Sequence, residues 1–424
     1  MPPPAPRRGR PTRPPRQDWD EKANLPEAVT AIVVLQGDGL WWAQDTEKLA
    51  MDYVSTLLPA MTIGVDLGDK TSEVYSVGGD GVEREMPAVR TTRDRVEAYF
   101  GEIPPARIVI ECGTHSPWVS RVLEGLGHQV IVANTRQMPR RQRKFDKMDA
   151  RNLAREGRVD PRKLYPIRHR GLEAQTDLAL LRARRALVRA RTLMVNHVRG
   201  VVKSFGYRVP SCGSEAFANV AKATVPDELR EALGPLIQQI RQLTKQIRRF
   251  DAKVEAKVKK YPEIKLLRQV KGVGPVTSLA FVLLIEDPKR FEDSRDVGAY
   301  FGLVSRVWAS GASNPQLRIT KAGDEMMRSL LTNAAHYILG PFGPDCDLRR
   351  YGEKMAARGG KNAKKRAVSA VARRLSVLLH VLWKKGAVYE PLRNTGNREG
   401  AEALRQGQRP RHKMTTGRIA VSNC

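Results

Sequence analysis

The sequence predicts a mixed α/β domain followed by a largely helical region. Three observations support this: short apolar runs of strand length recur between residues 62 and 133, apolar residues repeat every three or four positions between 172 and 258, and helical patterns continue to about 385. Short runs bounded by turn residues are typical of buried strands, whereas the longer repeat is typical of amphipathic helices. The 424 residues suffice for two or three domains.

The strands and helices of the first domain, residues 61–165, alternate in a recognisable order. Gly-Gly-Asp-Gly at 78–81 and Gly127 mark turns, and Thr91 and Thr92 cap the first helix. Three strands followed by helix, strand, helix and strand describe a mixed sheet of the ribonuclease H type. The expected strands are Thr62–Leu67, Ser72–Val77, Val82–Val89, Arg107–Glu111 and Gln129–Ala133, and the expected helices are 92–100 and Ser116–Leu126.

Residues 166–262 are expected to form a long helical coiled-coil hairpin. One helix spans 172–202, and a second follows Pro235 and carries an apolar seam to Val258. Positions away from the seam are rich in Lys and Arg. The alternative is a solvated coiled-coil surface that serves only to dimerise. The basic positions expected to bind nucleic acid are Arg182, Arg185, Arg189, Lys245, Arg248 and Lys257.

Residues 263–388 are expected to form a further helical domain that opens with two helices joined by Gly-Val-Gly. This pattern predicts a helix-hairpin-helix, in which backbone N–H groups face a phosphate. Lys271, Gly272 and Gly274 are then candidate nucleic-acid contacts. The alternative is a tight turn between helices, with Gly at the cap.

The two ends of the chain are expected to be disordered. Met1–Arg16 holds seven Pro and five Arg, which cannot build a core. Residues 1–60 are therefore interpreted as a dispensable basic extension, or an over-extended reading frame, and 389–424 as a basic tail.

Charge predicts the class of partner. Lys and Arg number 74 against 45 Asp and Glu, a formal net charge of +29, which favours binding to a polyanion such as nucleic acid. Four widely spaced Cys argue against a zinc ribbon and a disulfide framework. The absence of an apolar span or leader predicts a cytoplasmic, nucleoid-associated protein without a membrane partner.

Acidic residues at strand ends predict a metal site. Asp66 ends the first strand and Glu111 the fourth, and these strands are neighbours in the expected sheet. Asp146 and Asp149, three apart, share one face of a helix. Four carboxylates can hold two Mg²⁺ (or Mn²⁺) ions that stabilise the attacking and leaving oxygens of a phosphodiester. The preceding basic run would hold the phosphate backbone through Arg140, Arg141, Arg143 and Lys144.

Each acidic residue has another interpretation. A Gly-Val-Asp-Leu-Gly strand also opens actin-like ATPases, a Glu at a strand end is usually just exposed, and Asp146 and Asp149 among Lys and Arg could form solvated ion pairs.

Ser310 lies in a loop of small residues that ends in Leu317–Lys321. A nucleophilic Ser needs an exposed position and an activating base or metal. By chemistry alone, Ser310 is more often an ordinary turn residue.

Together these segments resemble the insertion-sequence-110 transposase family over about residues 61–385. Asp66 in GVDLGDK, Glu111 in IECGTHSPW, Asp146 and Asp149 in KFDKMDA, and Ser310 in ASGASNPQLRITKAG match its motifs in order. Ala309 replaces a Ser that often precedes the family's Ser-Gly. This replacement favours Ser310 as the nucleophile, with Ser313 and Ser305 as alternatives. A second departure is Gly302-Leu303-Val304-Ser305 in place of the usual Gly-Leu-Thr-Pro.

The resemblance implies a ribonuclease-H-like (RuvC-like) catalytic domain and a recombinase that cuts and rejoins DNA. It implies that Ser310 forms a phosphoserine link, assisted by metal held by Asp66, Glu111, Asp146 and Asp149. Arg318, directly before the Ile-Thr-Lys element, and Lys321, its last residue, would contact nucleic acid. Implied partners are donor and target DNA, a structured guide RNA, and further copies in a dimer or tetramer. The alternatives are a nuclease or junction resolvase without a covalent intermediate, and an actin-like ATPase.

Overall fold

The structure is a computed structural model that describes residues 60–135, 137–138, 146–310, 313, 315 and 317–394, with only the backbone of Asp146 and Lys147. The chain divides into two compact units between His169 and Arg170. The predicted extension before residue 60 and the tail after residue 394 lie outside the described residues. Within the described part, no helix is long and apolar enough to cross a membrane.

The first unit is built on a five-stranded mixed sheet, as predicted. Its strands lie in the order β3-β2-β1-β4-β5, the order of ribonuclease-H-like folds. β1 pairs antiparallel with β2 and parallel with β4, so the sheet changes direction at its centre. The strands are β1 (Met61–Asp66), β2 (Thr71–Gly78), β3 (Glu83–Arg90), β4 (Arg107–Glu111) and β5 (Gln129–Ala133).

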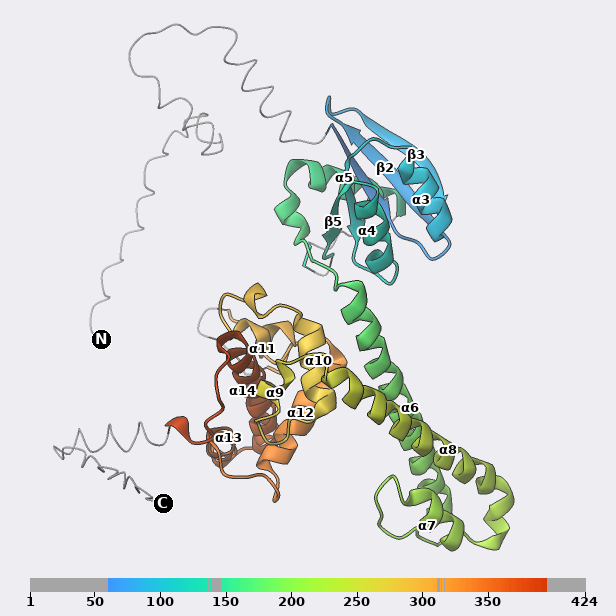
Figure 1. Cartoon of the computed structure of the whole chain (residues 1–424), viewed down its shortest axis with the longest axis vertical. Helices are drawn as coiled ribbons and strands as arrows, with labels where there is room; N and C mark the ends of the chain where they lie inside the picture. Colours follow the sequence, from blue (N-terminus) through green and yellow to red (C-terminus); the bar gives the residue numbers. More distant parts are fainter. Residues whose placement is uncertain are drawn as a thin grey trace, which may run out of the picture. The chain divides into compact units, whose positions relative to one another are not determined.

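Helices cover both faces of this sheet (Figure 1). Side chains alternate between the faces of a strand, so Ile63 and Val65 pack with Val96 of α3 (Arg93–Gly101) and Val119 of α4 (Ser116–Gly125). Gly64, between them, faces α5 (Asp146–Val159) on the other side. A short helix at Pro161–Leu164 follows α5 and pairs with the end of β5.

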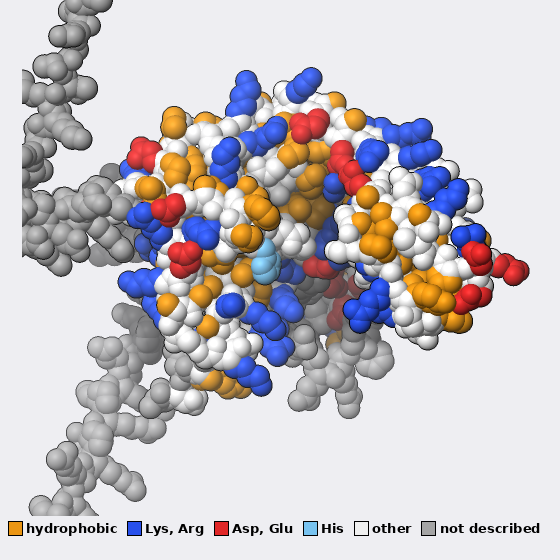
Figure 2. All heavy atoms as spheres, turned by 90° about the horizontal axis from the view of Figure 1, so that it is seen from below, with side chains coloured by type: hydrophobic (Ala, Val, Ile, Leu, Met, Phe, Trp, Pro, Cys, Tyr) orange, Lys and Arg blue, Asp and Glu red, His pale blue; other side chains and the backbone are white. Residues whose placement is uncertain are grey.

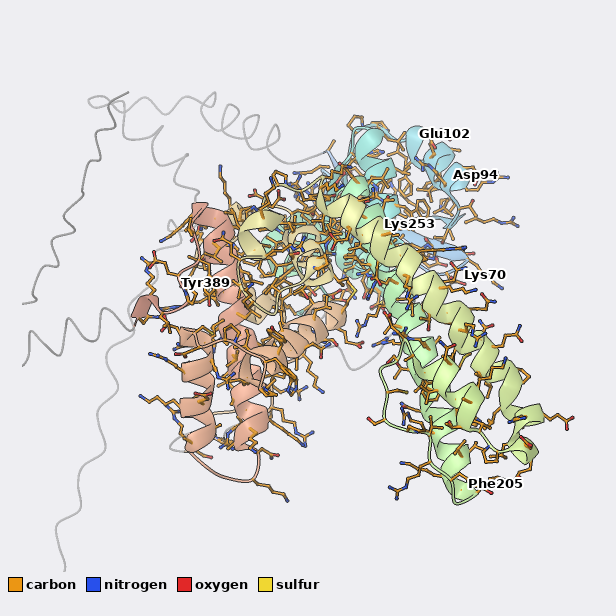
Figure 3. All side chains as sticks on the ribbon, turned by 60° about the horizontal axis from the view of Figure 1, so that its bottom comes forward. Lys70, Asp94, Glu102, Phe205, Lys253 and Tyr389 are labelled. Carbon is orange, nitrogen blue, oxygen red and sulfur yellow. The ribbon has the colours of Figure 1, made fainter. Side chains whose placement is uncertain are left out.

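Two long helices open the second unit and pack side by side: α6 (Leu172–Ser204) and α8 (Asp227–Val258). Phe205 lies where α6 ends, at the far end of this helical pair (Figure 3). The short helix α7 (Phe217–Thr224), which the sequence interpretation missed, closes that end with a buried Phe217.

The predicted start of the second long helix after Pro235 is wrong, because α8 begins eight residues earlier and Pro235 lies inside it. Proline lacks the N–H of a helical hydrogen bond and crowds the preceding residue. Gly234 has no Cβ to be crowded, and Leu233 and Ile237 are buried on either side of the proline. Tertiary packing thus keeps the helix continuous where the local signal predicts a break.

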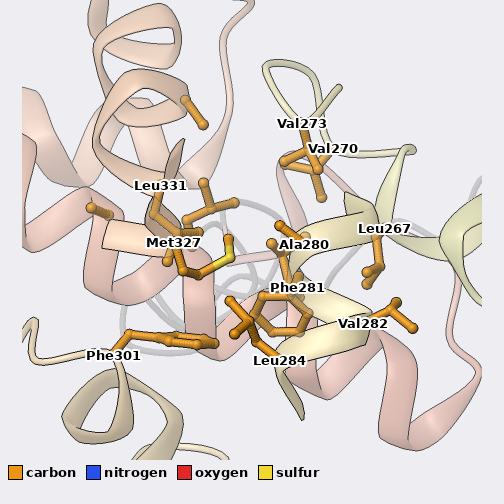
Figure 4. Packing of buried hydrophobic residues seen from close by; sticks show 14 of the residues in the cluster. Leu267, Val270, Val273, Ala280, Phe281, Val282, Leu284, Phe301, Met327 and Leu331 are labelled. Carbon is orange, nitrogen blue, oxygen red and sulfur yellow. The ribbon is translucent and has the colours of Figure 1, made fainter. Parts of the chain in front are cut away.

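The core of the second unit is centred on α10 (Pro275–Ile285), which packs against α6, α8, α9 and α12 and whose residues from Thr277 to Ile285 are all buried. Phe281 lies near Phe301 in this core, with Met327 and Leu331 of α12 close by (Figure 4). A helix that is buried on all sides needs neighbours on every side, and these helices provide them. The other elements are α9 (Ile264–Leu267), a short helix at Pro288–Arg290, α11 (Asp296–Tyr300), α12 (Glu325–Leu339), α13 (Asp347–Ala357) and α14 (Ala363–Lys385).

The chain after α14 folds back onto this core, beyond the boundary predicted at residue 388. The N–H of Tyr389 donates to Gln269 Oε1 at 2.9 Å, and Tyr389 packs against the helical core (Figure 3). The N–H of Asp347 donates to the carbonyl of Pro391 at 2.7 Å. Residues 389–394 therefore pack on the helical core as part of the second unit.

His380 is fully buried on α14 and makes the stability of the second unit sensitive to pH. One ring nitrogen lies 2.8 Å from the carbonyl of Pro288 and the other 2.9 Å from Ser294 Oγ. Burial lowers the pKa of His380. The folded protein therefore keeps this ring neutral at pH values where the unfolded chain binds a proton, and stability falls as pH drops below about 6.5.

We expect the free energy of unfolding to fall by up to about 1.4 kcal/mol for each pH unit below about 6.5 through this group. Denaturant unfolding at about pH 7.5 and about pH 5.5 would be compared with that of His380→Gln, whose amide can still donate to Pro288. The wild-type chain should lose more stability than the variant on acidification. Equal losses in the two proteins would contradict a role for His380.

Candidate functional site

Asp66 and Glu111 lie next to each other at one edge of the sheet. Val65 of β1 pairs with Ile110 of β4 in parallel register, so the next residue of each strand is Asp66 or Glu111. Both residues are half-buried. The ends of β1 and β4 are called the carboxyl edge below.

Helix α5 brings Asp149 to the same edge. A Cβ added to Gly64 would lie 2.0 Å from the carbonyl oxygen of Ala150, and one added to Gly157 would lie 2.3 Å from Val109 Cγ2. The helix therefore runs antiparallel to β1, with its first turn beside Asp66 and Glu111. Asp149 is half-buried, and Asp146 opens the same turn.

The loops that follow β1 and β4 are held by hydrogen bonds. Thr135 donates its hydroxyl to Glu111 Oε1 at 2.6 Å. The indole N–H of Trp118 donates to His115 Nδ1 at 3.1 Å, and His115 Nε2 lies 3.6 Å from Asp69 Oδ1. These contacts join the loop after β1 to the start of α4.

The backbones of the predicted metal ligands thus come to one edge, but the described side chains, those of Asp66, Glu111 and Asp149, do not form a closed cage. Among the described side chains, no group of three or more His, Cys, Asp or Glu lies close enough to hold a metal ion. The side chain of Asp146 lies outside the described residues. The donors themselves are carboxylates, the ligands that Mg²⁺ and Mn²⁺ prefer.

Glu83 fastens α5 to β3, a contact that sequence reasoning missed. Its carboxylate accepts from Arg151 at 2.6 and 2.9 Å and from Arg155 at 2.5 and 2.9 Å, and Tyr75 donates to it at 3.1 Å. Hydrogen bonds from Arg155, and then those from Arg151 and Tyr75, lower the pKa of Glu83 to about 2. The helix that carries Asp149 is therefore tied to the sheet by two arginines one turn apart.

Ser310 lies in the second unit, near the tip of a paired segment that we call the serine ribbon, the described residues 302–310, 313, 315 and 317–321. Ser305 pairs with Ile319 at its base, and Ser310 pairs with Ser313 near its tip through two backbone hydrogen bonds of 3.0 Å. Ser305, Ser310 and Ser313 are all exposed. The three serines therefore differ in their place on the ribbon and not in their exposure, with Ser310 and Ser313 paired near its tip and Ser305 at its base.

Trp308 shares a face of the ribbon with Ser310. The backbones of Arg306 and Ser310 both point at the returning chain, with Arg306 N donating to Arg318 O at 2.9 Å. Alternate residues of an extended segment share a face, which places Trp308 between them. Its side chain is 75% exposed, a rare state for so large an apolar group. The sequence marks this exposed aromatic group only by its place two positions before Ser310, a feature that the sequence interpretation did not include.

Most of the predicted basic contacts on α6 and α8 are ion-paired within the chain. On α6, Arg182 lies 3.4 Å from Asp324 and Arg185 lies 2.9 Å from Glu325, with which Arg189 also pairs. On α8, Arg248 lies 2.8 Å from Glu215 and Lys257 lies 2.6 Å from Asp177. Lys245 is exposed. Figure 2 shows a face on which Lys and Arg side chains are widespread and Asp and Glu side chains are fewer.

The other predicted contacts have different positions. Gly272 has a positive φ of 92° and packs against Tyr337, where a Cβ would lie 2.9 Å from the ring. Lys271 is exposed, Gly274 precedes α10, and Arg318 and Lys321 are exposed on the serine ribbon. Arg140, Arg141, Arg143 and Lys144 lie outside the described residues.

Both units match models of one transposase family. Residues 63–206 match the IS110 DEDD transposase model, and residues 264–345 match the model described as Transposase IS116/IS110/IS902 family. The first match contains the carboxyl edge, and the second contains the serine ribbon.

Curated proteins agree with this assignment. A "Probable family 20 transposase" of Pseudomonas aeruginosa is 28% identical over 340 residues, covering 78% of this chain and 98% of that protein. The "Transposase for insertion sequence element IS1328" of Yersinia enterocolitica is 27% identical over 293 residues, covering 66% and 85%. That for element IS1111A of Coxiella burnetii is 25% identical over 291 residues, covering 65% and 77%. The chain therefore belongs to the IS110/IS116/IS902 family of transposases, enzymes of DNA strand transfer, with an N-terminal DEDD domain and a helical C-terminal region.

Proposed function

We propose that this transposase cuts and rejoins DNA through a phosphoserine intermediate formed by Ser310. The observation that carries the proposal is the exposure of Ser310 on a hydrogen-bonded ribbon whose base is packed on a rigid core. Its hydroxyl oxygen attacks a phosphorus atom, the phosphodiester bond to one sugar oxygen breaks, and that oxygen leaves with a proton. The new phosphoserine ester replaces the broken phosphodiester, so the bond energy is conserved for rejoining.

Divalent metal is the implied cofactor, since the DEDD domain is a nuclease-type domain. Asp66, Glu111, Asp146 and Asp149 would hold it, because they are oxygen donors at one edge of the sheet. A bound Mg²⁺ or Mn²⁺ ion neutralises charge that develops on phosphate oxygens. The chain's own contribution is to hold the carboxylates: Thr135 orients Glu111, and Glu83 fastens the helix of Asp149.

A structured guide RNA and assembly into dimers or tetramers complete the proposal. The formal net charge of +29 supports a second polyanion besides DNA. The packed pair α6 and α8 supports the coiled-coil interpretation, and the turn from Lys271 to Gly274, with Gly272 packed on α12, supports a helix-hairpin-helix. Because five of the six basic residues named on α6 and α8 are ion-paired, a phosphate that bound there would compete with carboxylates.

The test is to incubate the purified protein with labelled DNA that spans an end of its element, with Mg²⁺ or with excess chelator. Denaturing separation shows whether cut strands are free or linked to protein. We expect a protein–DNA adduct that needs metal and is lost in Asp149→Asn, while Asp94→Asn, an exposed carboxylate on α3, behaves like the wild type.

The outcomes separate the alternatives. Metal-dependent cutting without an adduct would favour the nuclease or resolvase interpretation. Full cleavage in excess chelator would exclude the metal mechanism. The same reaction after ribonuclease treatment tests the guide, since an unchanged yield of specific products would argue against an RNA partner.

A further inference from the structure

A basic groove of about 1150 Å³ lies within the second unit, apart from the carboxyl edge. One wall is α14, a second is α13, a third is residues 389–394, and the fourth is the base of the serine ribbon. In Figure 1 the helices α13 and α14 lie close together at the end of the described chain.

The groove is strongly cationic. Two carboxylates line it, those of Asp347 and Glu390. Asp347 is already engaged, because it accepts 2.9 Å hydrogen bonds from both the N–H and the side-chain amide of Asn394. The lining cations are Arg295, Arg318, Lys321, Lys365, Arg366, Arg373, Arg374 and Arg393.

These cations differ from those of α6 and α8 because none has an ion-pair partner among the residues that the structure describes. Arg366 donates to the carbonyl of Gly359 at 2.7 Å, and the Arg374 guanidinium stacks 3.5 Å from the centre of the Tyr351 ring. Such contacts orient the side chains without neutralising them. Eight cations gathered beside two carboxylates repel one another, and a bound polyanion relieves that repulsion.

The spacing along α14 fits a nucleic-acid strand. Lys365 and Arg366 lie two turns before Arg373 and Arg374, with Ser369 and Ala370 between them. Eight residues of helix span about 12 Å. That length corresponds to three or four nucleotides, because each strand of a duplex advances about 3.4 Å per nucleotide. The small residues leave room for the backbone between the two basic pairs.

The groove shares a wall with the base of the ribbon that carries Ser310. Ser305, Arg318 and Ile319 line it at the base of the serine ribbon, and the pairing of Ser305 with Ile319 fixes that base. Ser310 is five residues further along, so it lies within about 17 Å of Ser305 even in a fully extended chain. A strand held in the groove is therefore presented within a few nucleotides of this hydroxyl.

We propose that this groove binds the phosphate backbone of the DNA strand that Ser310 attacks, so that α14 positions the scissile phosphate. The proposal rests on the proposed function for the identity of the strand. The binding itself follows from the unpaired charge, the spacing along α14 and the shared wall with the serine ribbon.

The experiment measures binding of mixed-sequence DNA, single-stranded and duplex, to the full chain in excess chelator, where no cleavage occurs. The groove variant combines Lys365→Gln, Arg373→Gln and Arg393→Gln. The matched control combines Lys203→Gln, Lys222→Gln and Lys259→Gln, three exposed lysines of the same unit outside the groove. We expect the groove variant to weaken DNA binding by roughly tenfold or more and to reduce the log–log salt slope by about 3. The control variant should change neither.

Two further measurements, on a charge-preserving variant and on RNA, complete the test. Lys365→Arg, Arg373→Lys and Arg393→Lys together keep the charge and should restore binding, which separates a lost phosphate contact from a folding defect. The same titrations are repeated with a mixed-sequence RNA hairpin. The affinity for this RNA should fall no more in the groove variant than in the control variant. Equal DNA affinity in groove and control variants, or an RNA loss as large as the DNA loss, would overturn the proposal. Because no chemistry is involved, failure to form a phosphoserine adduct would not by itself alter this result.

Discussion

Ser310→Ala is expected to abolish the protein–DNA adduct and to lower recombination by roughly 10⁴-fold or more, as loss of a nucleophile generally does. The hydroxyl is exposed near the tip of the serine ribbon, and its methyl replacement leaves the backbone pairing with Ser313 intact. DNA binding and thermal stability should therefore stay close to those of the wild type. The measurement is the yield of protein-linked DNA under denaturing conditions, together with excision of the element in cells.

Ser313→Ala and Ser305→Ala are the matched controls. Ser313 is the important one, because it lies directly across the ribbon from Ser310. If Ser313→Ala loses the adduct while Ser310→Ala keeps it, the nucleophile is Ser313. If all three single variants retain the adduct, a covalent link to this ribbon is wrong.

Gly64→Ala is expected to stop strand cleavage by a different route, through displacement of α5. The added methyl would lie 2.0 Å from the carbonyl oxygen of Ala150 and 2.5 Å from the N of Ala154, and both are backbone atoms. The helix must lift from the sheet, which costs about 1–3 kcal/mol of stability in a well-packed core. A misplacement of about 1 Å at Asp149 is sufficient to lower the rate by about 10²-fold.

The measurements are unfolding by denaturant and metal-dependent cleavage, with Gly125→Ala as the control. Gly125 lies in α4, where a Cβ would meet no atom within 4 Å, so this variant should fold and cleave normally. Gly157→Ala should show a smaller effect than Gly64→Ala, since its new contact is the side chain of Val109. Wild-type cleavage by a fully stable Gly64→Ala would show that the position of α5 does not govern the reaction.

Strand positions could be predicted from sequence because strand formation in the first unit is a local signal. Apolar runs end at Asp66 and Glu111, and the chain order of strands and helices leaves few ways to build a sheet. The site residues followed from the same signal, since adjacent parallel strands bring their ends together. The helices now labelled α6 and α10 were also predicted from the local sequence, at 172–202 and directly after Gly-Val-Gly.

Contacts between distant residues could not be predicted this way. Glu83 meets Arg151 and Arg155 about seventy residues later, and nothing in either segment marks the partner. The basic residues of α6 looked free in the sequence, but Asp324 and Glu325 at the start of α12 are paired with them. Conversely, Lys365 and Arg373 resemble ordinary surface residues in the sequence. The structure shows that they line one groove together with Arg318 and Arg393.

The sequence by itself therefore determined the class of each segment, the acidic residues at the strand ends and the family that their order resembles. These features depend on periodicity and on neighbours within a few positions. The tertiary structure alone decided that α5 lies close enough on Gly64 to bring Asp149 to Asp66 and Glu111. It also decided which cations stay unpaired, because the electrostatic environment of a charge is set by groups that approach it in space, whatever their separation along the chain.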